Sequence, residues 1–579
     1  MAAMRSDEGI RYEPDERSPW PVSAVVGFQG VMLILPQSVL YMSIVALSAG
    51  QDDTYLTWAV FAALALNGVG TALQAARIGR LGTGHVLITG TATPLIAITI
   101  IALSEGGPAM LASLVLVSSL LQFMLAAWMP LLRRVITPLV SGTVLMLVAV
   151  TIVPIAIERL TDVPEGIPVA AGPTAAAATL IVTIGLGLRA SGAMRLWTPL
   201  AGIVAGCAVA GLLGLYDAQP FFDAPWAGAP AFALPEFELP PSMEFWSLLP
   251  AFLVMTLVIA IMAMGGGIAI QQASWRTPRV PDFRLVQGAV RANGVASLLA
   301  GLAGIMPTMV HSANSVSLTS FTGVASRRVG FAFGIILIGL ALLPKLTALL
   351  LTVPAAVAGA FVLIIMGHLM VEGIRMVARD GLDYRKALVV GVSFSLGSGL
   401  QSQDIFGELF GSAWGLMLNN GVLTGGLAAI LITSFMELIQ PRRRRLKADL
   451  DVSALPGIDE FLRGLAADCG WNDTSTNRLC LVAEEVLLSL LGETEVDGAD
   501  SERSLTIYAR PDGKAVDLEF LATPQDENIE DRIAYLSEQA ESPEEHEMSF
   551  RLLKQLASTV RHRKYHGMDI VSVQVSRAR

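Results

Sequence analysis

The chain has 579 residues, of which 53% are hydrophobic and only 15% are charged, and its formal net charge is −10. A soluble protein of this size carries nearer a quarter charged residues, so the composition excludes an ordinary soluble globular protein and indicates a membrane protein. The three cysteines (Cys207, Cys469 and Cys480) have spacings that match neither a zinc site nor a disulfide framework.

The predicted elements begin with a polar, acidic N-terminal tail over residues 1–20, which is not a secretory signal peptide. Apolar windows of about 20 residues then predict an α-helical transmembrane domain over 21–440. It contains two sets of seven spans, in repeats of about 21–216 and 247–438. The first set is 21–48, 55–75, 86–104, 109–129, 136–157, 174–190 and 197–215. The second set is 247–271, 288–304, 307–322, 329–350, 354–374, 387–403 and 418–438.

Arginine and lysine fall in alternate loops of this arrangement, for example at Arg77, Arg80, Arg327 and Arg328, and acidic residues fall in the loops between. The bias predicts a multi-pass protein of the inner (plasma) membrane with both termini in the cytoplasm.

The third span of each set is interrupted. Residues 82–97 are rich in Gly and Thr and contain Pro94, and residues 304–328 contain Pro307 and a run of Ser, Thr, His and Asn. Matching interruptions in two halves indicate a transporter site at an inverted-repeat interface. A broken helix exposes backbone N–H and C=O groups that can hold polar or anionic ligand atoms. The alternative is a Pro-kinked helix whose hydroxyls bond to its own carbonyls.

The last part of the chain, residues 441–579, predicts a small cytoplasmic α/β regulatory domain. A helix is expected over 476–491, strands over 504–509 and 515–521, a helix over 547–560 and a strand over 569–575. The basic run Arg442–Arg445 is interpreted as an anchor beside the membrane, so nucleic-acid binding is not expected.

Five sequence elements together resemble the nucleobase–ascorbate transporter family, which includes bacterial uracil and xanthine permeases. They are residues 25–30 (VVGFQG), 77–81 with 90–93 (RIGRL, GTAT), 137–143 (TPLVSGT), 291–328 and 372–386. The resemblance covers roughly residues 20–438. It implies a 7+7 inverted repeat with a core domain and a gate domain, a nucleobase bound near the third and tenth helices, and coupling to H⁺ or Na⁺.

The chain departs from the family at its acidic positions. The glutamate of the eighth helix is replaced by Met264, the acidic or amide residue of the tenth aligns with Ala313 or Asn314, and the histidine of the first helix is Gly30. The predicted substrate-binding residues are therefore neutral. They are Gln29, Thr91, Ala92, Thr93, Met264, Gly267, Gln271, His311, Ser312, Ala313, Asn314 and Ser315.

Two of these residues carry specific expectations. Gln271 lies seven residues after Met264, hence on the same helical face, and amides can pair with a uracil- or xanthine-like edge. His311 lies inside the interrupted segment, where a titrating side chain would make transport depend on pH.

The C-terminal domain resembles the anti-sigma-factor type of the histidine-kinase-like ATPase fold. The paired Glu484 and Glu485 match its first box, but Ser489 replaces the asparagine that follows, so we expect a degenerate, regulatory form.

The favoured function is a secondary transporter, a symporter or permease for a nucleobase-like purine or pyrimidine, embedded in the lipid bilayer as a homodimer. Two alternatives remain open: an anion carrier of the sulfate or bicarbonate type, and a non-transporting sensor that signals through residues 441–579. No catalytic constellation, metal site or cofactor is predicted.

Overall fold

The structure is a computed structural model. It describes residues 10–132, 137–164, 166–190, 194, 197–230, 235, 237–238, 241–276, 281–378, 381–401, 420–439, 444–491, 504–512, 515–522, 556–565 and 568–576. The chain divides into two compact units, Met1–Ser274 with Leu285–Phe435, and Trp275–Arg284 with Met436–Arg579.

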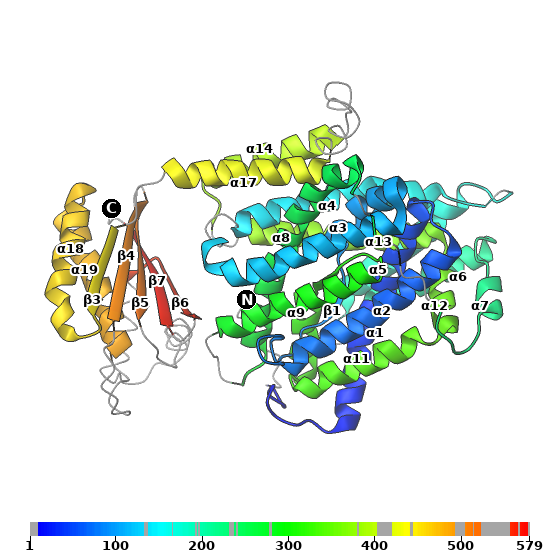
Figure 1. Cartoon of the computed structure of the whole chain (residues 1–579), viewed down its shortest axis with the longest axis horizontal. Coiled ribbons are helices and arrows are strands. Elements are labelled where there is room, and N and C mark those ends of the chain that lie inside the picture. Colours follow the sequence, from blue (N-terminus) through cyan, green and yellow to red (C-terminus); the bar gives the residue numbers. More distant parts are fainter. Residues whose placement is uncertain are drawn as a thin grey trace. The chain divides into compact units, whose positions relative to one another are not determined.

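The first unit is a bundle of long apolar helices (Figure 1). Their bounds are α1 Trp20–Ser48, α2 Asp53–Ala76, α3 Ile96–Leu132, α4 Pro138–Glu158, α5 Ala171–Arg189, α6 Thr198–Leu212, α7 Gln219–Asp223, α8 Met243–Ala273, α9 Phe283–Leu302, α10 Ser312–Thr322, α11 Arg327–Ala341, α12 Pro344–Leu351, α13 Ala355–Ala378, α14 Tyr384–Gln401 and α17 Gly421–Ile439.

Local signals explain where several of these helices begin. The side chains of Asp52, Thr137 and Ser242 accept hydrogen bonds from the first turns of α2, α4 and α8. Proline stands in the first turn of α1, α4 and α6, where its missing N–H costs no helical hydrogen bond.

Seven helices in the described part of the chain are long and apolar enough to cross a membrane, and an eighth is counted if α11 and α12 form one bent span. The protein is therefore a polytopic helical membrane protein. The predicted spans 86–104 and 109–129 are joined in α3, which kinks at Gly107 where φ is +64°.

The predicted span over 329–350 is bent in the structure. The axes of α11 and α12 meet at 80°, with the break at residues 342–343. Pro344 opens α12 and has no N–H with which to continue α11, although the apolar composition runs on through the break.

The two predicted interruptions are present, and each contains a short strand. β1 (Thr89–Thr91) leads through the 3₁₀ helix η1 (Thr93–Leu95) into α3, and β2 (Thr308–Val310) leads into α10. β1 lies among the helices of the first unit in Figure 1.

The second unit contains an antiparallel sheet with strand order β3-β4-β5-β7-β6. The strands are β3 Arg444–Asp449, β4 Ser504–Asp512, β5 Ala515–Ala522, β6 Thr559–Tyr565 and β7 Met568–Ser576. The helices α18 (Leu455–Asp468) and α19 (Asp473–Leu491) lie on one face of the sheet (Figure 1). Alternate residues of β4 and β5 (Leu505, Ile507, Val516, Leu518 and Phe520) are buried in its core, as period-2 strands require.

The expected strands at 504–509, 515–521 and 569–575 correspond to β4, β5 and β7, and the expected helix at 476–491 corresponds to α19. The predicted helix over 547–560 is wrong at its end, because Thr559 and Val560 open β6; residues 547–555 lie outside the described residues. The expected membrane anchor is in part a strand, since Arg444 and Arg445 open β3.

Candidate functional site

The interrupted segments of the two halves meet as an antiparallel strand pair, with Thr89 opposite Val310, Gly90 opposite Met309 and Thr91 opposite Thr308. Hydrogen bonds extend the pairing at both ends. The N–H of Ala92 donates to the carbonyl of Pro307 at 2.9 Å, and the N–H of His311 donates to the carbonyl of Ile88 at 2.8 Å. The strand pair therefore joins two segments that lie more than 200 residues apart.

Each strand is followed directly by the N-terminal end of a helix. No side chain in the described part of the chain caps α10, whose first intrahelical bond runs from the N–H of Ser315 to the carbonyl of His311 at 3.1 Å. The N–H groups of its first turn thus have no intrahelical acceptor, and they carry the partial positive charge of the helix dipole. Such an end can bind an electronegative ligand atom without a charged side chain.

His311 stands between β2 and α10, where its ring packs against Gly90 of β1. A Cβ at position 90 would lie 2.6 Å from Nε2 of the ring, so the close contact requires glycine there. His311 as a whole residue is partly buried.

The first turn of α10 carries the other predicted residues of this segment. Ser312 and Asn314 are partly exposed and Ala313 is exposed, so packing within the protein does not fully cover these three positions. Ser315 is different, because its buried hydroxyl accepts from the N–H of Ile88 at 2.9 Å and donates to the carbonyl of His311 at 2.8 Å. Ser315 therefore links the two interrupted segments.

The predicted residues that precede α3 are buried. The hydroxyl of Thr91 accepts from Nδ2 of Asn67 at 3.4 Å, the N–H of Ala92 extends the strand pair, and Thr93 lies in the first turn of η1. These three residues shape the end of β1.

Gln29 lies on α1. A Cβ on the neighbouring Gly30 would lie 3.0 Å from Leu318 of α10, so this part of α1 packs on α10. The Oε1 atom of Gln29 is buried and finds no hydrogen-bond partner among the residues that the structure describes. A buried acceptor without a partner is costly, which makes this oxygen a candidate to receive a ligand N–H.

The helix α8 contacts the strand pair through Gly266. A Cβ there would lie 3.2 Å from Cβ of Ser312 and 3.3 Å from Val310. The predicted Gly267 packs instead against Val286 and Ala289 of α9. Adjacent helical residues point about 100° apart, so a shift of one position changes the contacted element.

The other two predicted residues of α8 also lie near this contact. Met264 packs against an apolar cluster that includes Val310 of β2 and Leu87, which precedes β1. Gln271 is buried, and its Nε2 donates to the carbonyl of Gly267 at 3.1 Å, on the side of α8 that packs against α9. Within the described residues, no Asp, Glu, Lys or Arg is buried, so the centre of the first unit is polar but uncharged.

Two hydroxyls that the sequence analysis did not select also hold the strands. Thr71 of α2 accepts from the N–H of Thr89 at 2.9 Å, and Ser297 of α9 donates to the carbonyl of Thr308 at 3.2 Å. The signal that could have found them is a fully buried polar residue within an apolar span.

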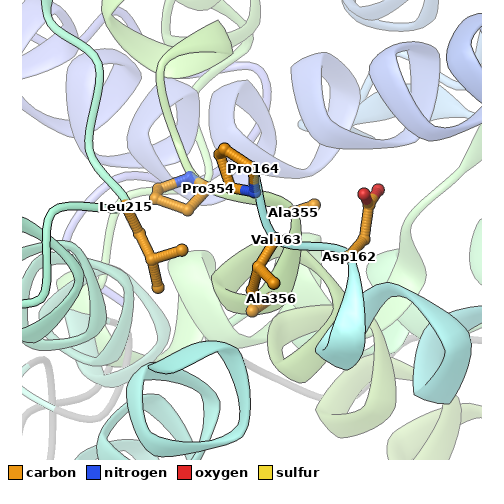
Figure 2. A pocket seen from close by; sticks show the side chains of 7 residues that line it. All are labelled: Asp162, Val163, Pro164, Leu215, Pro354, Ala355 and Ala356. Atoms are coloured by element: carbon orange, nitrogen blue, oxygen red, sulfur yellow. The ribbon is translucent and has the colours of Figure 1, made fainter. Parts of the chain in front are cut away.

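A pocket of about 240 Å³ lies elsewhere in the first unit (Figure 2). It is lined by Asp162, Val163, Pro164, Leu215, Pro354, Ala355 and Ala356. None of these was predicted to bind substrate, and the lining offers one carboxylate among mostly apolar side chains.

Comparison with known proteins gives a family model, described as Permease family, that matches residues 22–405. The chain is 25% identical to the xanthine permease XanP of Escherichia coli (strain K12), over 74% of this chain and 95% of XanP. It is 27% identical to the uric acid permease PucK of Bacillus subtilis (strain 168), over 73% of this chain and 97% of PucK. The solved transmembrane domain of the cyanobacterial bicarbonate transporter BicA is 14% identical, with a TM-score of 0.47 over 71% of this chain and 97% of that domain.

Proposed function

Because this chain belongs to the Permease family, we propose that it carries a nucleobase of the xanthine and uric acid class across the membrane. It is a transporter and not an enzyme. The observation that supports the proposal is the strand pair β1–β2. It brings the two interrupted segments together, and the uncapped N-terminus of α10 follows β2 directly.

The chemistry of the surrounding groups fits a hydrogen-bonding heterocycle. An oxopurine presents carbonyl oxygens and N–H groups along its edges. The N–H groups in the first turn of α10 suit the carbonyl oxygens, and the Oε1 of Gln29 suits a ring N–H. The side chains of His311, Ser312 and Asn314 are the further candidates to contact the substrate, with Gly266 as the close wall on α8.

The proposal extends to the whole transmembrane domain. Fourteen spans in a 7+7 inverted repeat would place the strand pair between equivalent third spans, and movement of a core domain against a gate domain would expose it to each side in turn. The cytoplasmic position of both termini, the homodimer and the coupling to H⁺ or Na⁺ stay predictions. The regulatory role of residues 441–579 is also a prediction.

Uptake by purified protein in proteoliposomes tests the function. We expect saturable uptake of radiolabelled xanthine or urate, competed by unlabelled purines and unaffected by sulfate or bicarbonate. Replacing Gly266 by a bulkier residue such as valine should abolish uptake, and the same change at Gly265, whose Cβ would meet nothing within 4 Å, provides the matched control.

The same assay separates the alternatives. Sulfate or bicarbonate uptake without purine uptake would support an anion carrier. Purine binding in a thermal-shift assay without uptake would support a sensor. Either result would refute the proposed transport function.

A further inference from the structure

The second helix of each half carries the same short pattern. Residues 67–71 in α2 read Asn-Gly-Val-Gly-Thr, and residues 293–297 in α9 read Asn-Gly-Val-Ala-Ser. The asparagine and the hydroxyl residue are four positions apart in both, so they lie on one helical face. All four of these polar side chains are buried.

In α2 this face holds β1. Nδ2 of Asn67 donates to the hydroxyl of Thr91 at 3.4 Å and to that of Ser38 at 3.0 Å. The hydroxyl of Thr71 accepts from the N–H of Thr89 and donates to the carbonyl of Asn67, both at 2.9 Å. Both ends of the three-residue strand are therefore tied to α2.

In α9 the equivalent face holds β2. Nδ2 of Asn293 donates to the carbonyl of Thr308 at 3.1 Å and to Oε1 of Gln122 at 3.2 Å. The hydroxyl of Ser297 lies 3.2 Å from both the carbonyl and the hydroxyl of Thr308. Thr91 and Thr308 are register partners, so the two helices converge on one pair of strand residues.

The glycines of the two patterns make equivalent contacts as well. A Cβ on Gly68 would lie 2.9 Å from the carbonyl oxygen of Gly334 in α11, and a Cβ on Gly294 would lie 3.3 Å from Gln122 in α3. In the proposed repeat, α11 and the second part of α3 are the fourth spans of the opposite halves. Each pattern thus packs against the other repeat.

Stability alone does not explain the two asparagines. Within the part of the chain that the structure describes, neither Asn67 Oδ1 nor Asn293 Oδ1 has a hydrogen-bond partner, although both side chains are fully buried. An unpaired buried amide oxygen destabilises a fold, and an apolar side chain of similar shape would avoid that cost. The same cost occurs at the same place in both patterns.

We propose that Asn67 and Asn293, with Thr71 and Ser297, are paired positioning residues that fix the strand pair before the substrate arrives. The inference rests on the proposed transport of a nucleobase. A strand pair held from both sides keeps Thr91, Thr308 and the start of α10 in their binding arrangement. Loosening it lowers the populated fraction of the competent state and so weakens apparent affinity.

The test compares Asn67→Leu and Asn293→Leu, each nearly isosteric and unable to donate, in the full chain reconstituted in proteoliposomes. Thr143→Val is the control, since its buried hydroxyl donates within α4, to the carbonyl of Leu139 at 2.8 Å. We expect each asparagine variant to raise the KM for xanthine about tenfold, the effect of losing one buried hydrogen bond, while Vmax stays within about threefold. Thr143→Val should change neither.

A KM within about twofold of wild type in either asparagine variant would overturn the proposal, as would a fall in Vmax at constant KM. If a leucine variant fails to insert into the membrane, Thr71→Val and Ser297→Ala replace it, and we expect the same rise in the KM for xanthine. Amide hydrogen exchange supplies a readout that needs no substrate: each asparagine variant should speed exchange in both 89–91 and 308–310. Wild-type protein that transports no purine would refute the proposed function, whereas unchanged exchange would refute the positioning role.

Discussion

Replacement of Gly90 by alanine is the sharpest single perturbation of the strand pair. The backbone at position 90 does not adopt a positive φ, so alanine meets no intrinsic backbone strain. The obstacle is the ring of His311, because the added Cβ would lie 2.6 Å from Nε2 and 2.7 Å from Cδ2. Ordinary contacts between such atoms begin at about 3.5 Å, so the ring must move by roughly 0.9 Å.

The backbone of His311 cannot move with its ring at low cost. Its N–H is bonded to the carbonyl of Ile88 at 2.8 Å, and its carbonyl accepts from the hydroxyl of Ser315 at 2.8 Å. Overpacking of this kind costs about 1–3 kcal/mol. Since about 1.4 kcal/mol is a factor of ten, we expect the KM for xanthine to rise between roughly fivefold and 150-fold.

The assay is initial-rate uptake in proteoliposomes, with Gly265→Ala as the glycine-to-alanine control in open space. A second variant, Gly90→Ala with His311→Ala, removes the ring and should restore the melting temperature that Gly90→Ala alone lowers. A KM and a melting temperature equal to wild type in Gly90→Ala would refute the steric reasoning. So would failure of the double variant to regain stability.

Three further outcomes follow from the contacts. Gly266→Ala should raise the KM severalfold because its Cβ would lie 3.2 Å from α10, whereas Gly265→Ala should not; equal effects would refute the close approach of α8. Arg327→Gln should lower the melting temperature more than Asp15→Asn. The ion pair between these two side chains is exposed and contributes only about 0–1 kcal/mol, whereas Arg327 also donates to the backbone carbonyl of Gly84. A larger effect of Asp15→Asn would contradict this reasoning. A hydrogen bond from Arg463, one helical turn away, lowers the pKa of Asp459. The ionised carboxylate therefore stabilises α18 at pH values above its unfolded pKa of about 3.9, and this stabilisation should be lost as the pH falls through the lower pKa of the folded state. Asp459→Asn should remove this pH dependence, measured by circular dichroism.

The sequence predicted the broken spans well because proline and glycine act locally. Pro94 and Pro307 interrupt apolar segments, and the structure has a short strand before or after each. The pairing of those strands depends on contacts between distant residues, which no local signal specifies. The bend at Pro344 was not predicted, although proline again supplies a local signal, because the apolar composition continues on both sides of it.

The predicted substrate-binding residues remain a prediction, and the element that each of them faces depends on helical phase. His311 directly precedes α10, and Ser312 and Asn314 lie in its first turn. Of the two adjacent glycines of α8, Gly266 contacts the strand pair and Gly267 contacts α9. Neighbouring residues of an α-helix point about 100° apart, so an alignment error of one residue predicts contact with the wrong neighbouring element.

Polar residues that hold the strands from a neighbouring helix were missed because their partners are far away in sequence. Asn293 bonds to Thr308 and Asn67 to Thr91, and neither bond follows from spacing within one helix. In the C-terminal unit, the strand β3 was not predicted because its sequence is highly charged. It begins at Arg444 and carries charged residues at its exposed positions, as edge strands often do.

The most direct test of the central claim is an experimental structure of the protein in lipid with xanthine or urate bound. The account predicts ligand density within hydrogen-bond distance of the first turn of α10, beside His311 and the strand pair β1–β2, with Gly266 of α8 forming one wall. A ligand bound elsewhere, or a third or tenth span that proves to be an unbroken helix, would contradict it.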